Sequence, residues 1–222
     1  MTRDTVLLDV DGTLIDSTYH CAIAWAKAFE TCGMQPPLWR IHRAIGMGGD
    51  QLVEHVTDER VEDEHGDALR EAWEDAYRPM LEEVRAFDGV RELVDLLHER
   101  GMRVALATSS NSEFADRALE TIGMRADDFD SLTTSSDADA SKPEPDILAS
   151  ALEKAGGTGA LLVGDSTWDI EAARRLGAPC VAVRTGGFGV DELTEAGAVL
   201  VVDAVGDLLD ADWDELLHTD PH

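Results

Sequence analysis

Short apolar runs, each bounded by charged or turn-forming residues, recur along the chain and predict buried strands. The first run reads Val-Leu-Leu and is followed at once by an acidic residue. Runs of this kind are typical of parallel sheets, whose strands are covered on both faces. The predicted strands cover residues 6–8, 103–107, 160–163, 180–183 and, as a fifth, 199–202.

Segments with the apolar period of an α-helix lie between these strands. Residues 90–100 carry apolar side chains at helical spacing and are followed by Gly101, which can end a helix. Helices are also predicted over 112–122 and 169–176, each with a glycine directly after it. Strands that alternate with such helices form βαβ units with right-handed crossovers. The predicted fold class is therefore α/β, with a Rossmann-like doubly wound parallel sheet.

The stretch from residue 16 to residue 86 breaks this alternation because its pattern is helical throughout. The helices predicted there cover residues 21–32, 39–45, 50–56 and 62–84. A Pro-Pro pair at 36–37 and the sequence Gly-Met-Gly-Gly at 46–49 separate them. The pattern indicates an all-helical subdomain inserted after the first strand of the core.

Composition is typical of a folded protein. The chain has 222 residues, of which 44% are apolar, so it can bury a core. No apolar run approaches the roughly 20 residues that cross a membrane, and the N-terminal apolar stretch is too short for a signal peptide. Cys21, Cys32 and Cys180 lack the spacing of a metal or redox motif, which favours a reducing compartment. We expect a cytoplasmic protein without a membrane partner.

The formal net charge of −28 comes from 46 acidic and 18 basic residues. Such a chain repels the phosphates of nucleic acids, so we expect no nucleic-acid partner. The acidity is compatible with adaptation to high salt and equally with a highly charged, soluble surface. Composition does not separate these two explanations.

Four polar clusters lie at or just after the ends of predicted strands, where open parallel sheets bind their ligands. The first reads DVDGT and covers residues 9–13. One of its two carboxylates, Asp9 and Asp11, could act as a nucleophile and the other as a general acid and base. The alternative is a solvated loop with two acidic side chains.

The second and third clusters could contact a phosphate group. Residues 108–111, Thr-Ser-Ser-Asn, offer hydroxyl and backbone N–H groups at a strand-to-helix turn. The alternative for them is an ordinary helix N-cap. Residues 141–145 contain Lys142, one of only three lysines, and two prolines that restrain the local backbone. Lys142 could neutralise phosphate charge, and the alternative is a solvated surface lysine.

The fourth cluster, GDSTWD at residues 164–169, has two acids four residues apart where a strand gives way to a helix. Both Asp165 and Asp169 can face one site, and their hard carboxylate oxygens suit Mg²⁺. The alternative is capping of the following helix by Asp165 or Ser166.

Together, in this order, the four clusters resemble the haloacid dehalogenase-like hydrolase superfamily. Residues 9–13 resemble its motif I, Thr108 motif II, Lys142 motif III and residues 164–169 motif IV. The resemblance covers essentially the whole chain and is nearest to the phosphoglycolate phosphatase and β-phosphoglucomutase group, which carries a helical cap. It implies a core domain of residues 1–15 and 87–222 and a cap domain of residues 16–86.

The resemblance also implies a mechanism and a Mg²⁺ cofactor. Asp9 would attack phosphorus and form an aspartyl-phosphate, while Asp11 would protonate the leaving oxygen and then activate water. Mg²⁺ would be bound by Asp9, the backbone carbonyl of Asp11 and Asp165. Asp169 would be a further metal ligand or would orient the metal-bound waters.

Thr108, Ser109 and Lys142 would hold the phosphate oxygens. The metal and the lysine would supply the local positive charge that this acidic chain needs around an anionic substrate. The partner implied is a small phosphorylated metabolite.

The inserted helices would then act as a cap over the site, with hinges near residues 15–17 and 85–88. We expect His20 and Arg43 of the cap to contact substrate, with Tyr19, Arg40 and the 46–49 loop as further candidates. The alternative for each side chain is a packing or solvated position.

Other activities of the superfamily fit the sequence less well. Asp11 argues against a dehalogenase, and Lys27 is misplaced for a Schiff base of the phosphonoacetaldehyde hydrolase kind. The loop at 45–49 lacks the lysine and arginine typical of β-phosphoglucomutases. We therefore predict a Mg²⁺-dependent phosphatase, monomeric or homodimeric. A sugar-phosphate mutase and a non-catalytic phosphometabolite-binding module remain as alternatives.

Overall fold

The computed structural model describes residues 3–221 and contains one six-stranded sheet, in the order β3-β2-β1-β4-β5-β6. All neighbouring strands are parallel. The strands are β1 (Thr5–Leu8), β2 (Arg103–Ala107), β3 (Ser131–Thr133), β4 (Ala160–Gly164), β5 (Cys180–Val183) and β6 (Leu200–Val202). The strand order reverses between β1 and β4, which is where doubly wound sheets open a crevice. The predicted fold class is confirmed.

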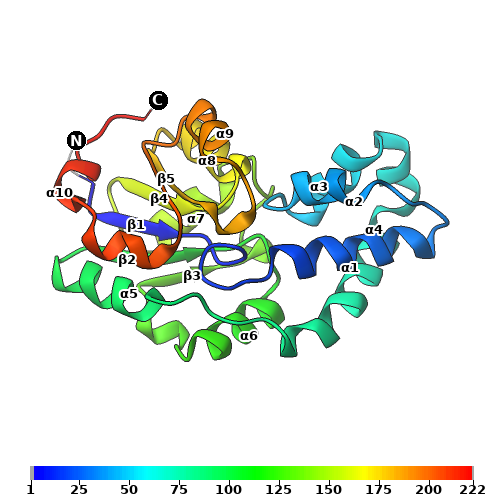
Figure 1. The fold of residues 1–222 in the computed structure, drawn as a ribbon, viewed down its shortest axis with the longest axis horizontal. Coiled ribbons are helices and arrows are strands. Elements are labelled where there is room, and N and C mark those ends of the chain that lie inside the picture. Colours follow the sequence, from blue (N-terminus) through cyan, green and yellow to red (C-terminus); the bar gives the residue numbers. More distant parts are fainter. Residues whose placement is uncertain (1–2, 222) are drawn as a thin grey trace.

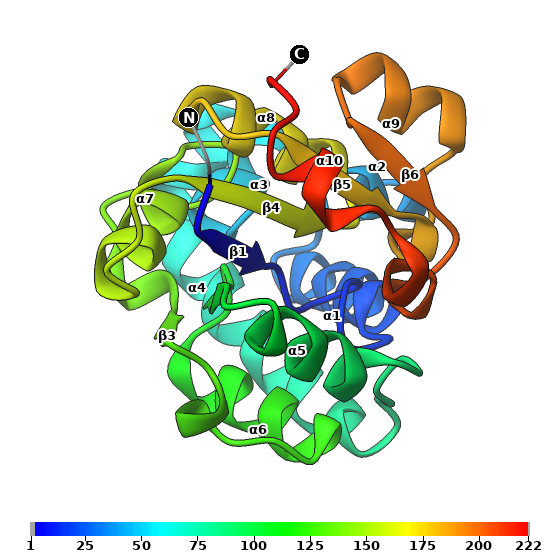
Figure 2. The same ribbon diagram turned by 90° about the vertical axis from the view of Figure 1, so that its left-hand side faces the viewer.

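Helices cover both faces of this sheet, and the alternation of side chains along β1 shows why. Val6 and Leu8 belong to one buried apolar cluster and Leu7 to the other, because successive strand residues point to opposite faces. The first cluster includes apolar side chains of α5 (Val90–Glu99), α6 (Ser112–Ile122) and the short α10 (Trp213–Leu216). The second includes α7 (Asp146–Lys154), α8 (Thr167–Leu176) and α9 (Val190–Ala196). Figure 2 shows α5 and α6 below β1 and α8 above β4.

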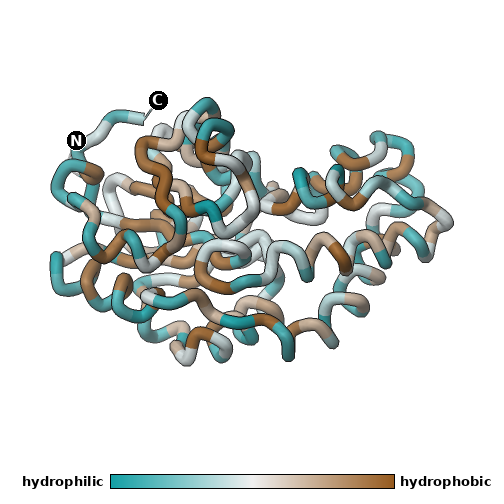
Figure 3. Tube along the Cα trace, viewed as in Figure 1, coloured by the Kyte–Doolittle hydropathy of each residue, from teal (hydrophilic) through white to brown (hydrophobic). Residues whose placement is uncertain are grey.

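The apolar segments follow this layering. Figure 3 shows hydrophobic stretches running through the middle of the sheet and hydrophilic ones on the outer turns. All four residues of β1 are buried, as expected for the central strand of a sheet that is covered twice.

The inserted segment forms a separate group of helices beyond one end of the sheet (Figure 1). These are α1 (Thr18–Thr31), α2 (Leu38–Ala44), α3 (Gly49–Val56) and α4 (Glu59–Tyr77), followed by a 3₁₀ turn over Arg78–Glu82. They enclose an apolar cluster of their own that includes Trp25, Phe29 and Leu69. The two connections to the core run side by side, with the amide of Asp16 donating to the carbonyl of Arg85 at 2.8 Å.

Two elements differ from the sequence-based expectation. Strand β3 was not predicted, because Ser-Leu-Thr contains one apolar residue and shows no run. The long helix predicted over 62–84 begins earlier, at Glu59, where the side chain of Asp58 accepts a bond from the amide of Val61. It ends at Tyr77, and Pro79 follows within the 3₁₀ turn because proline lacks the N–H that an α-helix needs.

Within residues 3–221, no helix has both the length and the apolar character required to cross a bilayer.

Charge repulsion should make the stability of the fold depend on salt. Raising KCl from 0.1 to 1 M shortens the Debye length from about 10 to about 3 Å, which screens the excess of 28 negative charges. We predict that the free energy of unfolding at pH 7.5, measured by urea titration, rises across this range. At pH 5, where part of the carboxylates are protonated, the gain should be smaller. A stability that stays constant or falls in KCl at pH 7.5 would contradict the prediction.

Candidate active site

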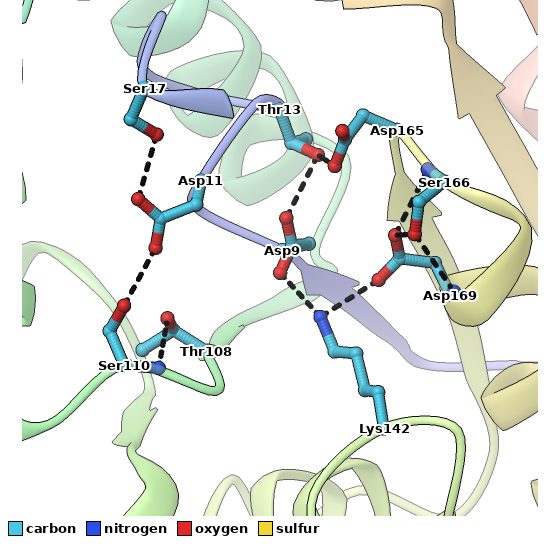
Figure 4. A network of polar contacts seen from close by, with 10 residues as sticks. All are labelled: Asp9, Asp11, Thr13, Ser17, Thr108, Ser110, Lys142, Asp165, Ser166 and Asp169. Atoms are coloured by element: carbon cyan, nitrogen blue, oxygen red, sulfur yellow. Dashed lines mark hydrogen bonds and ion pairs between the residues drawn. The ribbon is translucent and has the colours of Figure 1, made fainter. Parts of the chain in front are cut away.

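The carboxyl ends of β1, β2 and β4 meet at the edge of the sheet that faces the inserted helices (Figure 4). Asp9 follows β1, Thr108 follows β2 and Asp165 follows β4, while Lys142 comes from the loop between β3 and α7. Asp9, Asp165 and Asp169 each place a carboxylate oxygen within 4.8 Å of the other two. All three are buried. Four loops that are distant in the sequence therefore form one compact cluster of charges.

Lys142 is the positive charge at the centre of the cluster. Its side chain is 1% exposed, and its ammonium pairs with Oδ1 of Asp9 and, at 2.8 Å, with Oδ1 of Asp169. Burial alone would lower the pKa of Lys142, but the carboxylates of Asp169 and Asp9 outweigh it and raise that pKa above its ordinary value. The lysine therefore stays charged, because two carboxylates of opposite charge stabilise its buried ammonium group.

Asp169 is held in place by the start of helix α8. Its Oδ2 accepts bonds from the hydroxyl of Ser166 at 2.6 Å and from the amide of Ser166 at 3.1 Å. The amide of Asp169 donates back to the Ser166 hydroxyl at 3.3 Å, which completes a capping box. Asp169 thus completes the capping box with one oxygen and pairs with the lysine through the other. The N-cap is Ser166, one of the two capping residues that the sequence offered as the alternative, and Asp169 faces the charge cluster as well.

Asp9 and Asp165 have fewer partners than their charges require. The hydroxyl of Thr13 lies 3.1 Å from Oδ2 of Asp9 and 3.2 Å from Oδ1 of Asp165, but it has only one proton to donate. Burial raises the pKa of Asp9 to about 7, with Lys142 opposing and Asp169 adding to the rise. Burial also raises the pKa of Asp165, and the charge of Asp169 adds to it. Together with Asp169, the two carboxylates therefore outnumber the one ammonium group beside them.

These residues fit a divalent cation. Three buried carboxylates surround a single ammonium group, and hard oxygen donors of this kind suit Mg²⁺. The chain also leaves room beside Asp165: a Cβ on Gly12 would lie 2.4 Å from Oδ2 of Asp165, and Gly12 has a φ of +80°. A glycine is required at this turn on both counts.

The carboxylate of Asp11 points away from this cluster and lines a cavity. It accepts hydrogen bonds from the hydroxyl of Ser17 at 2.7 Å and from that of Ser110 at 2.8 Å (Figure 4). The two serines fix the orientation of Asp11 from two different segments. Neither contact was predicted: Ser17 is only six residues away but was assigned to a hinge, and Ser110 is 99 residues away and carries no local signal of such a contact.

The cavity has a volume of 290 Å³ and lies between the charge cluster and the inserted helices. On the core side it is lined by Asp9, Asp11, Thr108 and Ser109. The Ser109 hydroxyl is buried and has no hydrogen-bond partner within the described chain, so a ligand oxygen could use it. The hydroxyl of Thr108 accepts a bond from the amide of Ser110 at 3.1 Å and keeps its own proton available.

The inserted helices supply the opposite wall. Its residues come from α1, the loop before α3, and α4: Cys21, Trp25, residues 45–50, Arg70, Trp73 and Glu74. The side chains of α4 were missed from the sequence because they read as one face of an ordinary amphipathic helix. Arg70 is the basic residue of this wall, and it already pairs with Glu62 at 2.8 Å and with Asp67 at 2.9 Å.

His20 and Arg43, which were expected to contact substrate, lie outside this lining, whereas the 46–49 loop belongs to it. His20 has its ring 3.9 Å from a carboxylate oxygen of Glu83. Arg43 pairs with Glu192 of α9 and lies over the ring of Phe188, 4.2 Å from its centroid. Arg43 therefore joins the inserted helices to the core, and substrate contact by either residue stays a prediction.

Comparison with known proteins gives a consistent result. A family profile described as haloacid dehalogenase-like hydrolase matches residues 3–177. A phosphoglycolate phosphatase of Chromobacterium violaceum is 31% identical over 92% of this chain and 94% of that protein. The pyrophosphatase PpaX of Halalkalibacterium halodurans is 29% identical over 95% of this chain and 97% of that protein.

Solved structures show the same architecture. A hydrolase from Pseudomonas syringae superposes with a TM-score of 0.87 at 33% identity, covering 92% of this chain and 95% of that chain. A β-phosphoglucomutase from Clostridium difficile superposes with a TM-score of 0.78 over 92% of both chains. Its identity is 18%, so it shows the fold alone.

The excess negative charge predicts how stability depends on pH without metal. The folded pKa of Asp9, about 7, lies above the ordinary value of 3.8, so the folded state holds this proton more tightly than the unfolded state. The stability that this proton provides is full below about pH 4 and is lost as pH rises through 7. We predict that, in a chelator, the stability of wild type relative to Asp9→Asn falls by up to about 4 kcal/mol between pH 4 and 8.5.

The measurement is urea unfolding of both proteins across this pH range. Millimolar Mg²⁺ should restore the stability of wild type at pH 8 and change that of Asp9→Asn less, because ligands of the folded state stabilise it. A difference between the two proteins that is independent of pH would refute the assignment of excess charge to Asp9.

Proposed function

Because the chain belongs to the haloacid dehalogenase-like hydrolase family, we propose that it is a Mg²⁺-dependent phosphatase that hydrolyses a small phosphorylated metabolite through an aspartyl-phosphate at Asp9. It is an enzyme of the phosphatase kind, as its relatives are. The observation that carries the mechanism is the buried cluster of Asp9, Lys142, Asp165 and Asp169, of which Asp9 lines the cavity.

Asp9 is the proposed nucleophile. Its Oδ1 is held by the ammonium of Lys142, which leaves the other oxygen directed by Thr13. Attack of a carboxylate oxygen on phosphorus forms the Asp9–phosphorus bond and breaks the bond to the leaving oxygen. Phosphoryl transfer depends mainly on positioning and charge stabilisation, and a buried, pre-oriented carboxylate supplies the first of these.

Asp11 is the proposed general acid and base. The hydroxyls of Ser17 and Ser110 hold its carboxylate toward the cavity, where it can donate a proton to the leaving oxygen. In the second step the ionised Asp11 accepts a proton from water, the water oxygen bonds to phosphorus, and the bond from phosphorus to Asp9 breaks. One residue thus serves both steps, which returns the enzyme to its starting protonation state.

A divalent cation would be held by Asp9, Asp165 and the backbone carbonyl of Asp11, and it would neutralise charge on the phosphoryl group. Asp169 uses both its oxygens within the protein, on Ser166 and Lys142, so we assign it to orienting the lysine. Thr108, Ser109 and Lys142 would bind the phosphate oxygens, a role that the unpartnered hydroxyl of Ser109 supports.

Residues 16–86 are proposed to act as the cap, with residues 1–15 and 87–222 as the core. The paired connections support hinges there, since Ile15 and Ala86 form an isolated bridge between the two segments. Opening at this pair would admit substrate, and closure would exclude bulk water from the cavity.

Hydrolysis is favoured over a mutase activity by the cap wall. The 46–49 loop lines the cavity and carries no basic side chain to hold a second phosphate in place. Phosphoglycolate is the substrate proposed first, from the relative of that name, with pyrophosphate and small sugar phosphates to be compared. A mutase would convert a sugar 1-phosphate to its 6-phosphate, whereas the phosphatase releases inorganic phosphate.

The nucleophile assignment predicts that Asp9→Asn lowers kcat by at least about 10³-fold, because an amide cannot form the phosphorylated intermediate. Phosphate release from phosphoglycolate and from p-nitrophenyl phosphate, with Mg²⁺ present, measures it. Asp95→Asn is the matched control, since Asp95 is exposed on α5 and lies outside both proposed hinges. Appreciable turnover by folded, metal-loaded Asp9→Asn would exclude the mechanism.

A further inference from the structure

We propose that Asp50 of the inserted helices is a positioning residue for Lys142, so that docking of the 48–50 segment onto Ser141 fixes the ammonium beside Asp9. This inference rests on the proposed function, because Lys142 is taken to act on the transferring phosphoryl group. Residues 48–50 lie at the start of α3, and the sequence alone gives no sign that they contact the core.

The contact joins two segments 91 residues apart. The amide of Ser141 donates to Oδ2 of Asp50 at 3.1 Å. Ser141 is buried and directly precedes Lys142. The acceptor of its amide, Asp50, belongs to the inserted helices, which form the opposite wall of the cavity. Leaving a buried amide without a partner is unfavourable, so this bond constrains the lysine loop.

Gly48 allows the approach that this bond requires. A Cβ at position 48 would lie 2.2 Å from the hydroxyl oxygen of Ser141 and 2.3 Å from its Cβ. Gly48 has a φ of −72°, which any residue can adopt. The glycine is therefore needed for close packing on Ser141 and not for its backbone conformation.

The lysine needs such restraint because its ammonium must reach two carboxylates at once. It pairs with Asp9, which follows β1, and, at 2.8 Å, with Asp169, which lies in the first turn of α8. Beyond Lys142 the loop is tied to the core through the ion pair of Glu144 with Arg175. Asp50 restrains the other side. A displacement of about 1 Å at a reacting group can cost about 100-fold in rate.

Since Asp50 belongs to the inserted helices, the position of Lys142 depends on their docking. When the helices move away, the Ser141 amide loses its acceptor and the lysine loop loses one of its two restraints. The ammonium is thus set against Asp9 only while the cavity is closed, which couples closure to chemistry.

Asp50 also lines the cavity, and a direct contact with substrate would be a different role. The two roles predict different kinetics. A substrate contact alters KM and depends on the leaving group, whereas a displaced lysine lowers kcat by a similar factor for every substrate.

The experiment compares Asp50→Ala, Asp50→Asn and the control Glu54→Ala, which removes an exposed carboxylate from the same helix. Phosphoglycolate and p-nitrophenyl phosphate are the substrates. We expect Asp50→Ala to lower kcat about 10- to 100-fold on both, with KM changed less than about threefold. Asp50→Asn keeps an acceptor oxygen and should stay within about threefold of wild type, as should Glu54→Ala.

A second pair of variants tests the contact from the glycine side. Gly48→Ala should lower kcat as Asp50→Ala does, and adding Ser141→Gly should restore part of the loss by removing the side chain it strikes. Gly189→Ala is the control, because a Cβ there has no atom within 4 Å. Calorimetric binding of beryllofluoride with Mg²⁺, which needs no turnover, should weaken about 10-fold in Asp50→Ala.

Three outcomes would overturn the inference: a loss in Asp50→Ala confined to one substrate or to KM, an Asp50→Asn as impaired as Asp50→Ala, or wild-type activity in Gly48→Ala. If wild type and Glu54→Ala turn over normally, such a result leaves the proposed function intact. Absence of phosphate release and of beryllofluoride binding by wild type would reject both.

Discussion

One electrostatic constraint governs the structure: three buried carboxylates share a single buried ammonium group. The cost of removing these charges from water is met only if each is held against a partner or a bound cation. Asp9 and Asp169 meet Lys142, while Asp165 has little beyond the hydroxyl of Thr13. The parallel sheet makes the arrangement possible, because it brings three strand ends to one edge. The resulting deficit of positive charge makes the site suitable for a divalent cation.

The inserted helices complete this site and do more than cover it. Asp50 accepts from Ser141 on one rim, and on another the side chain of Asn111 donates to Glu74 at 2.9 Å. Phe114 of α6 joins the apolar cluster of the inserted helices. These contacts hold the inserted helices against the core loops that contain Ser141, Lys142 and Asn111. Movement of these helices would change the restraint on the reacting groups as well as the access of water.

The sequence predicts the parts of this structure that follow from local pattern. Apolar runs that end in acids located Asp9 and Asp165, and the order of the motifs identified Lys142. The contacts that orient them were not predictable, because they depend on distances across the fold. Ser110 reaches Asp11 over 99 residues, and nothing near Ser110 separates it from a helix cap. For the same reason Arg43 and Arg70 look alike in the sequence, although only Arg70 lines the cavity. Strand β3 escaped prediction because its place at the edge of the sheet is decided by pairing with β2 and not by its own composition.

An acidic chain should repel a phosphorylated substrate, yet this protein is a phosphatase. The conflict is resolved by the distance over which each charge acts. Exposed charges are screened beyond about 10 Å at moderate salt, so those of the 28 excess negative charges that lie farther away act only weakly on a phosphate at the sheet edge. In the buried cluster the effective dielectric is lower than in water, so the ammonium of Lys142, and a cation held by the carboxylates, would act more strongly on a phosphate there than surface charges do. The positive charge that the proposed function requires would therefore be supplied locally, at the sheet edge. The precision with which Lys142 is held consequently matters more here than in a protein whose whole surface attracts its substrate. This reasoning gives the bond between Asp50 and Ser141 a functional meaning beyond the packing of two loops.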